Sequence, residues 1–130
     1  MRKRVLVVDD DRLVADTLRM VFVVNGFESE ACYSVADALQ RARSFDPELL
    51  LCDVTMPGEN GLQLAATISN EIPKCQMIML TAYLSNAASV ELEALRMKRP
   101  LKLLSKPCRP ELLLKEAGEL LGHRTLSAAS

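Results

Sequence analysis

The stretch Leu49-Leu-Leu-Cys-Asp53, followed at once by Val54-Thr-Met-Pro57, decides the fold of this chain. The apolar run is short, and turn-forming residues bound it, with Asp46-Pro47 before it and Pro57-Gly58 after it. This pattern favours a fully buried strand that ends in a carboxylate. Ligands of open α/β sheets bind beyond the carboxyl ends of the strands. We therefore predict that Asp53 lies where the protein does its chemistry.

The rest of the chain alternates between strand and helix. Apolar runs and period-two alternation predict strands, and apolar residues three or four positions apart predict helices. The predicted strands are 5–8, 27–33, 49–53, 76–80 and 101–104, and the predicted helices are 12–25, 34–45, 61–71, 86–98 and 110–121. Asp11 and Ser34 are expected to cap two of the helices, and Gly26 and Gly122 are expected to end two.

Five such alternations predict an α/β fold with one doubly wound parallel sheet of five strands and five helices on its two faces. The predicted domain spans residues 1–122, and residues 123–130 are expected to form a flexible tail. At 130 residues the chain is long enough for one buried core.

Composition excludes several classes of protein. Hydrophobic residues make up 49% of the chain, and a formal net charge of -1 gives no indication of nucleic-acid binding. The sequence contains no apolar run near the roughly 20 residues that span a bilayer, so we expect no membrane partner. The four cysteines are scattered without a C-x-x-C pair, which is typical of reduced thiols in a cytoplasmic protein.

Polar side chains follow several predicted strands. Asp9 and Asp10 follow the first strand, Thr81 follows the fourth and Lys106 the fifth. In doubly wound sheets with strand order 2-1-3-4-5, the first and third strands are neighbours. That order is taken from known sheets of this kind, and with it Asp9 and Asp10 lie beside Asp53.

Three carboxylates in one crevice require an explanation. Two unit charges about 4 Å apart repel by roughly 1 to 4 kcal/mol, so either one group is protonated or a cation binds. Oxygen ligands suit Mg²⁺, while Lys106 and Thr81 offer an ammonium and a hydroxyl to a phosphoryl oxygen. Together these groups predict phosphoryl transfer onto Asp53. The simpler interpretation, that an aspartate merely caps a helix, is favoured for Asp11.

Four motifs carry a resemblance to a known family. They are Val7-Val-Asp-Asp-Asp11, Asp53-Val-Thr-Met-Pro57 with Gly61, Leu80-Thr-Ala82 and Ser105-Lys-Pro107. In this order and spacing they resemble the receiver domain of bacterial two-component response regulators, and the resemblance runs from residue 4 to residue 121. It implies a flavodoxin-like, three-layer αβα fold and a signalling phosphoacceptor rather than an enzyme.

The resemblance also implies a partner and a metal. Asp53 would accept a phosphoryl group from a histidine on a sensor kinase or a histidine phosphotransfer protein. Asp10 and Asp53 would bind Mg²⁺ through their carboxylates, Thr55 through its backbone carbonyl, and Asp9 through water. A downstream protein target, which the sequence does not identify, would then read the phosphorylated state.

Further residues are assigned by the resemblance to the phosphoryl group itself. Thr81 would move toward it and Lys106 would pair with it. Thr55 and Tyr83, each two residues after a motif residue, would border it and control how readily water reaches it.

Two features depart from the family pattern. Receivers usually carry an aromatic switch residue three positions before the lysine, where this chain has Leu103. The usual Gly-Ala pair before the fifth strand is Arg99-Pro100, and the segment from Thr81 to Lys106 is longer than typical. Both departures fall on the fourth helix, fifth strand and fifth helix, the face that receivers commonly offer to partners. We predict that this protein signals through an altered version of that face.

Other functions fit the sequence less well. A flavin carrier needs a phosphate-cradling loop where this chain has three aspartates, and the P-loop pattern G-x-x-x-x-G-K-[ST] is absent. A dehalogenase-type hydrolase usually has a second aspartate at the position of Thr55. The competing hypothesis is a receiver-like module that docks constitutively and is not phosphorylated, and Leu103 and Arg99-Pro100 favour it.

Overall fold

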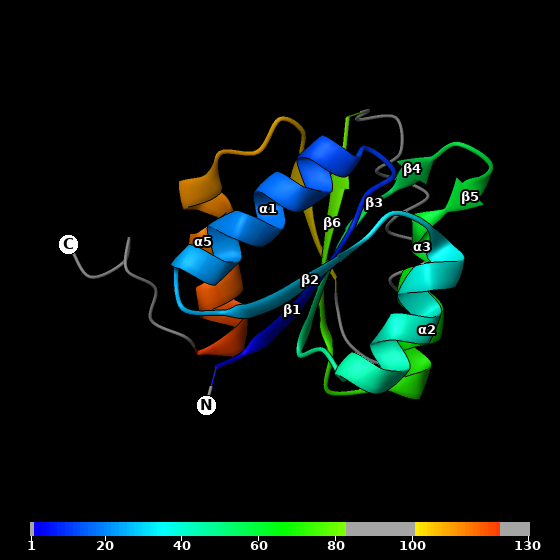
Figure 1. Ribbon diagram of the computed structural model, residues 1–130, viewed down its shortest axis with the longest axis horizontal. Helices are drawn as coiled ribbons and strands as arrows, with labels where there is room; N and C mark the ends of the chain where they lie inside the picture. The colour runs from blue at the N-terminus through cyan, green and yellow to red at the C-terminus, as the bar shows by residue number, and fades with distance from the viewer. Residues whose placement is uncertain (1, 83–100, 123–130) are drawn as a thin grey trace.

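A parallel five-stranded sheet forms the centre of the computed structural model, which describes residues 2–82 and 101–122 (Figure 1). The strand order is β2-β1-β3-β6-β7. Counted along the sequence, this is the predicted order 2-1-3-4-5, and the prediction is confirmed. The strands of the sheet are β1 (Arg4–Val8), β2 (Glu28–Cys32), β3 (Leu49–Asp53), β6 (Gln76–Thr81) and β7 (Leu101–Ser105).

Four helices of the described residues cover the two faces of the sheet. They are α1 (Arg12–Val24), α2 (Val35–Phe45), α3 (Gly61–Glu71) and α5 (Pro110–Leu121). Figure 1 shows α1 and α5 on one face and α2 and α3 on the other, which gives three layers. The predicted helix 86–98, Tyr83, Arg99-Pro100 and the tail 123–130 lie outside the described residues. Among the described helices, none has the length and apolar character needed to cross a membrane.

Local sequence signals start and stop these helices as predicted. The Asp11 side chain accepts hydrogen bonds from the backbone N–H groups of Leu13 and Val14, and the Ser34 side chain accepts one from Asp37. Such caps satisfy N–H groups that have no partner inside the helix. Gly26 and Gly122, which end α1 and α5, have φ angles of 93° and 64°.

The core divides between the two faces because neighbouring residues of a strand point to opposite sides. In β1, Val5 and Val7 pack in the cluster with Phe22 and Leu113 on the α1–α5 face, while Leu6 and Val8 join the cluster on the α2–α3 face. All five residues of β3 are buried. A strand buried on both faces explains why 49–53 is a continuous apolar run rather than an alternating one.

The segment after Asp53, which the sequence predicted as a loop, contains a short antiparallel hairpin. Its strands are β4 (Thr55–Met56) and β5 (Glu59–Asn60), with Thr55 opposite Asn60 and Met56 opposite Glu59. Gly58 turns the chain with a φ of 70°, a conformation that glycine adopts without a steric penalty. Two-residue strands are too short to produce a recognisable alternation, which is why the sequence did not predict them.

Candidate functional site

Acidic side chains meet at the carboxyl ends of β1 and β3. The two strands are paired, with Val8 opposite Cys52, so the residues that follow lie side by side. Carboxylate oxygens of Asp9, Asp10 and Asp53 all lie within 4.8 Å of one another. Asp9 and Asp53 are buried and Asp10 is exposed, so the cluster opens to solvent on one side.

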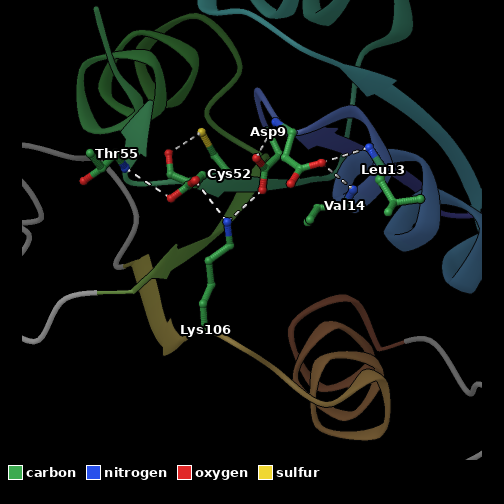
Figure 2. A network of polar contacts seen from close by, with 8 residues as sticks. Asp9, Leu13, Val14, Cys52, Thr55 and Lys106 are labelled. Carbon is green, nitrogen blue, oxygen red and sulfur yellow. Dashed lines mark hydrogen bonds and ion pairs between the residues drawn. The ribbon is translucent and has the colours of Figure 1, made fainter. Parts of the chain in front are cut away.

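The Lys106 ammonium is held between two of these carboxylates. Its Nζ lies 2.9 Å from Asp9 Oδ2 and 3.0 Å from Asp53 Oδ2. Figure 2 shows its side chain extending from the end of β7 toward the gap between Asp9 and Cys52. The Lys106 backbone N–H also donates to the Thr81 carbonyl oxygen at 2.8 Å, which fixes the start of this side chain against the end of β6.

The two threonines assigned to the site lie at different depths. Thr81 is the last residue of β6 and is 3% exposed, beside the strand that carries Asp53. Thr55 is exposed, and its backbone N–H donates to Asp53 Oδ1 at 3.2 Å (Figure 2). The Asp53 carboxylate is therefore held at both oxygens, by Thr55 at one and by Lys106 at the other.

Leu103 lies in β7, opposite Met79 of β6. It is half-buried and packs against the core cluster on the α2–α3 face. A leucine packed in this way cannot repeat the ring reorientation of an aromatic switch residue.

Burial and charge act in opposite directions on this cluster. Burial raises the pKa of the Asp53 carboxyl, and the hydrogen bonds from Lys106 and Thr55 offset this only in part. For Lys106, burial lowers the pKa, but its bonds to Asp9 and Asp53 outweigh burial and the net shift is upward. The pKa values of Asp53 and Lys106 can both rise because the two groups have different numbers of partners. The Lys106 ammonium is stabilised by two carboxylates, whereas Asp53 shares this one ammonium with Asp9.

This donor set fits a magnesium ion. Mg²⁺ prefers carboxylate, carbonyl and water oxygens, and usually takes one or two protein carboxylates. Asp10 is exposed at the edge of the cluster, and its carboxylate lies within 4.8 Å of those of Asp9 and Asp53. Three carboxylates against one ammonium leave an excess of negative charge, which is also what raises the affinity of a site for a divalent cation.

Two residues contact the backbone of Asp53 in ways that the sequence did not predict. The Cys52 thiol, whose pKa burial raises, donates to the Asp53 carbonyl oxygen at 3.2 Å. Gly61, the first residue of α3, lies so close that a Cβ at this position would be 2.0 Å from the same oxygen. The motif contained Gly61, but sequence spacing does not reveal how closely two segments approach.

Comparison with known proteins agrees with this geometry. The family model described as the response regulator receiver domain matches residues 5–117. The chain belongs to the response regulator receiver family. Receivers act in two-component systems as phosphoacceptor domains, and the acidic cluster of Asp9, Asp10 and Asp53 fits the phosphorylation site of such a domain.

Curated relatives of this receiver are longer proteins. The DNA-binding response regulator MtrA of Mycolicibacterium paratuberculosis is 36% identical over 84 residues, which cover 63% of this chain and 36% of that protein. The response regulator MprA of Mycobacterium ulcerans is 35% identical over 82 residues, covering 63% of this chain and 35% of that protein. The chain thus spans about a third of the length of the curated relatives it matches.

Solved receivers share the fold over nearly the whole chain. A CheY-like receiver domain protein of Methanospirillum hungatei has a TM-score of 0.82 at 26% identity, with 95% of this chain and 97% of that chain covered. The chemotaxis protein CheY4 of Vibrio cholerae has a TM-score of 0.81 at 24% identity, with 92% and 99% covered. The flavodoxin-like, three-layer fold predicted from the sequence is thereby confirmed.

Proposed function

We propose that this receiver accepts a phosphoryl group on Asp53 from a phosphohistidine of a sensor kinase or of a histidine phosphotransfer protein. The observation that carries the proposal is the Lys106 ammonium, held 2.9 Å from Asp9 Oδ2 and 3.0 Å from Asp53 Oδ2. A cation fixed beside the acceptor carboxylate is placed to pair with an oxygen of the arriving phosphoryl group.

The transfer itself is a displacement at phosphorus. An Asp53 carboxylate oxygen forms a bond to phosphorus while the bond from phosphorus to the donor imidazole breaks, and the histidine keeps the electron pair. Lys106 then pairs with a phosphoryl oxygen, and the Thr81 hydroxyl is a second donor at the end of the neighbouring strand. Thr55 and Tyr83 would control access of water. Because the product stays on the chain, we regard the protein as a signalling phosphoacceptor rather than an enzyme.

The metal belongs to the same proposal. Asp10 and Asp53 would hold Mg²⁺ through carboxylate oxygens and Thr55 through its backbone carbonyl, with Asp9 acting through water. When bound, the ion would supply positive charge to the phosphoryl oxygens and neutralise the repulsion between the carboxylates. The partners are proteins, and we propose no nucleic-acid or membrane contact for this chain. We expect it to act in the cytoplasm, in keeping with its four free cysteines, of which three are buried.

Intact mass spectrometry tests the phosphoacceptor function directly. The wild-type protein is incubated with Mg²⁺ and a small phosphodonor such as acetyl phosphate, and a parallel sample contains excess EDTA. We expect the Mg²⁺ sample to gain the mass of one phosphoryl group, which hydroxylamine should remove because it cleaves acyl phosphates. A wild-type protein that forms no adduct in Mg²⁺ would contradict the proposal.

The output surface is the second part of the proposal. We propose that phosphorylation changes the contacts of the face formed by the predicted helix 86–98, β7 and α5, in a form altered by Leu103. Leucine supplies less differential stabilisation than a ring that moves between exposed and buried positions. A shift from 1:99 to 99:1 requires about 5.5 kcal/mol, so we expect a smaller change in population here. The same substitution also favours the competing hypothesis, in which the protein is a receiver-like module that binds its partner constitutively without phosphorylation.

NMR separates these two forms of output. We expect beryllofluoride, a phosphoryl mimic, to shift the backbone amide signals between Thr81 and Lys106, because both ends of this segment lie at the site. The Asp53→Asn variant is the matched control and should show no such shifts. Constitutive docking predicts that the wild-type signals in this segment are the same with and without the mimic.

A further inference from the structure

The hairpin that follows Asp53 connects the acceptor carboxylate to the rest of the α2–α3 face. Thr55, whose backbone N–H donates to Asp53 Oδ1, pairs with Asn60 across the hairpin, and Met56 pairs with Glu59. Met56 is 2% exposed and belongs to the core cluster on this face. The backbone that holds the Asp53 carboxylate is therefore one residue pair away from Glu59.

Glu59 reaches out of the hairpin to the start of α2. The backbone N–H of Val35, the first residue of α2, donates to Glu59 Oε1 at 3.0 Å. The first N–H groups of a helix lack partners within it, and the helix dipole favours a negative charge at this end. The Ser34 side chain accepts the N–H of Asp37, so it satisfies a different group. The Glu59 carboxylate adds a second side-chain acceptor to this end of α2 from 24 residues away.

Asn60, next to Glu59 on β5, caps the other helix of the same face. Its side chain accepts the backbone N–H groups of Leu62 and Gln63 at the start of α3. These bonds join residues two or three positions apart, so they fix the start of α3 only relative to the residues that directly precede it. The Glu59–Val35 bond differs because it ties the hairpin to a helix from another part of the chain. In Figure 1 the hairpin lies beyond the ends of both helices.

We propose that Glu59 is a positioning residue for the phosphoacceptor site. Its bond to Val35 holds β5 against the start of α2. Because β4 pairs with β5, this bond also fixes β4, which contains the Thr55 backbone N–H that donates to the Asp53 carboxylate. This inference rests on the proposed function of Asp53 and adds a residue that no motif assigned. Coupling of this kind is reciprocal, so occupancy of the site also stabilises the start of α2.

Three variants separate positioning from a merely structural helix cap. Glu59→Ala removes the bond to Val35, and Glu59→Gln keeps an acceptor oxygen at the same place. Ser34→Ala is the matched control, because it weakens the same end of α2 without touching the hairpin. The readouts are the Mg²⁺ dissociation constant from NMR titration, and the hydrogen exchange rate of the Val35 amide with and without Mg²⁺.

We expect Glu59→Ala to raise the Mg²⁺ dissociation constant about five-fold, the effect of one lost hydrogen bond. Glu59→Gln should stay within about two-fold of the wild type, and Ser34→Ala should bind Mg²⁺ as the wild type does while losing stability. Mg²⁺ should slow Val35 exchange in the wild type and leave it unchanged in Glu59→Ala.

The outcomes separate this inference from the proposed function. If Glu59→Ala and Ser34→Ala lose similar stability and both bind Mg²⁺ like the wild type, Glu59 is only a helix cap and the inference is wrong. A wild-type protein that does not bind Mg²⁺ also overturns it. If Mg²⁺ affinity depends on Glu59 but the wild type forms no phosphoryl adduct, the positioning role of Glu59 is supported and the proposed phosphoacceptor function of Asp53 is wrong.

Discussion

Asp53→Asn is expected to form no phosphoryl adduct and, in metal-free protein, to be more stable than the wild type. The amide cannot form an acyl phosphate, so loss of the adduct should be complete. The amide has one oxygen, which can still accept from Thr55 N–H. Lys106 loses its bond to the second Asp53 oxygen but keeps its bond to Asp9. What disappears is a buried negative charge beside another carboxylate. We expect the free energy of unfolding to rise by about 1 kcal/mol, a size common for stabilising substitutions.

The pH dependence of this gain has a definite sign. Burial raises the pKa of Asp53 in the folded protein above its ordinary value of 3.8. Between the unfolded and the folded pKa, the folded protein binds more protons at this group, so the wild type loses stability as the pH rises through that window. Asparagine does not titrate, so the difference between the two proteins isolates this group.

Urea unfolding in EDTA from pH 3 to pH 7 measures that difference. We expect the two proteins to be nearly equal at the acidic end, with Asp53→Asn becoming the more stable one as the pH rises. Added Mg²⁺ should stabilise the wild type more than the variant, since a ligand stabilises the state that binds it. A variant that is less stable than the wild type at pH 7 in EDTA would show that Asp53 is not destabilised by burial.

Gly61→Ala is expected to lower the free energy of unfolding by about 3 kcal/mol, the upper part of the range for overpacked sites. A Cβ at Gly61 would lie 2.0 Å from the Asp53 carbonyl oxygen and 3.1 Å from Cys52 Sγ. The first of these is a backbone atom of a buried strand, which cannot move aside as a flexible side chain could. Relief requires α3 and the end of β3 to separate, so Asp53 is displaced as well.

Gly58→Ala in the same connection is the matched control. Gly58 has a φ of 70°, and apart from its own two neighbours no described residue has an atom within 4 Å of the place that a Cβ would take. Alanine there therefore introduces backbone strain without a clash. We expect it to cost about 1 kcal/mol and to leave the phosphorylation rate close to that of the wild type. Urea unfolding and intact mass after phosphodonor treatment measure both variants. Equal stability of Gly61→Ala and the wild type would mean that α3 does not depend on this close approach.

The positions of the elements were largely predictable from the sequence. Each strand of the five-stranded sheet and each described helix was expected within one residue of its observed ends, since local patterns determine these choices. The Asp11 and Ser34 caps are examples, because each bond joins residues two or three positions apart. The short β4–β5 hairpin was missed for lack of a local pattern. Strand order was carried over from known doubly wound sheets.

The sequence by itself determined an α/β chain with Asp9, Asp53 and Thr81 at or just after the ends of its strands, because apolar periodicity and turn residues act over a few positions. The tertiary structure decided what those ends contact. Lys106 meets Asp9 across 97 positions, and Glu59 meets Val35 across 24. It also decided that Asp53 is buried enough to raise its pKa. Distances and burial of this kind depend on how elements pack together, and residue spacing along the chain does not specify them.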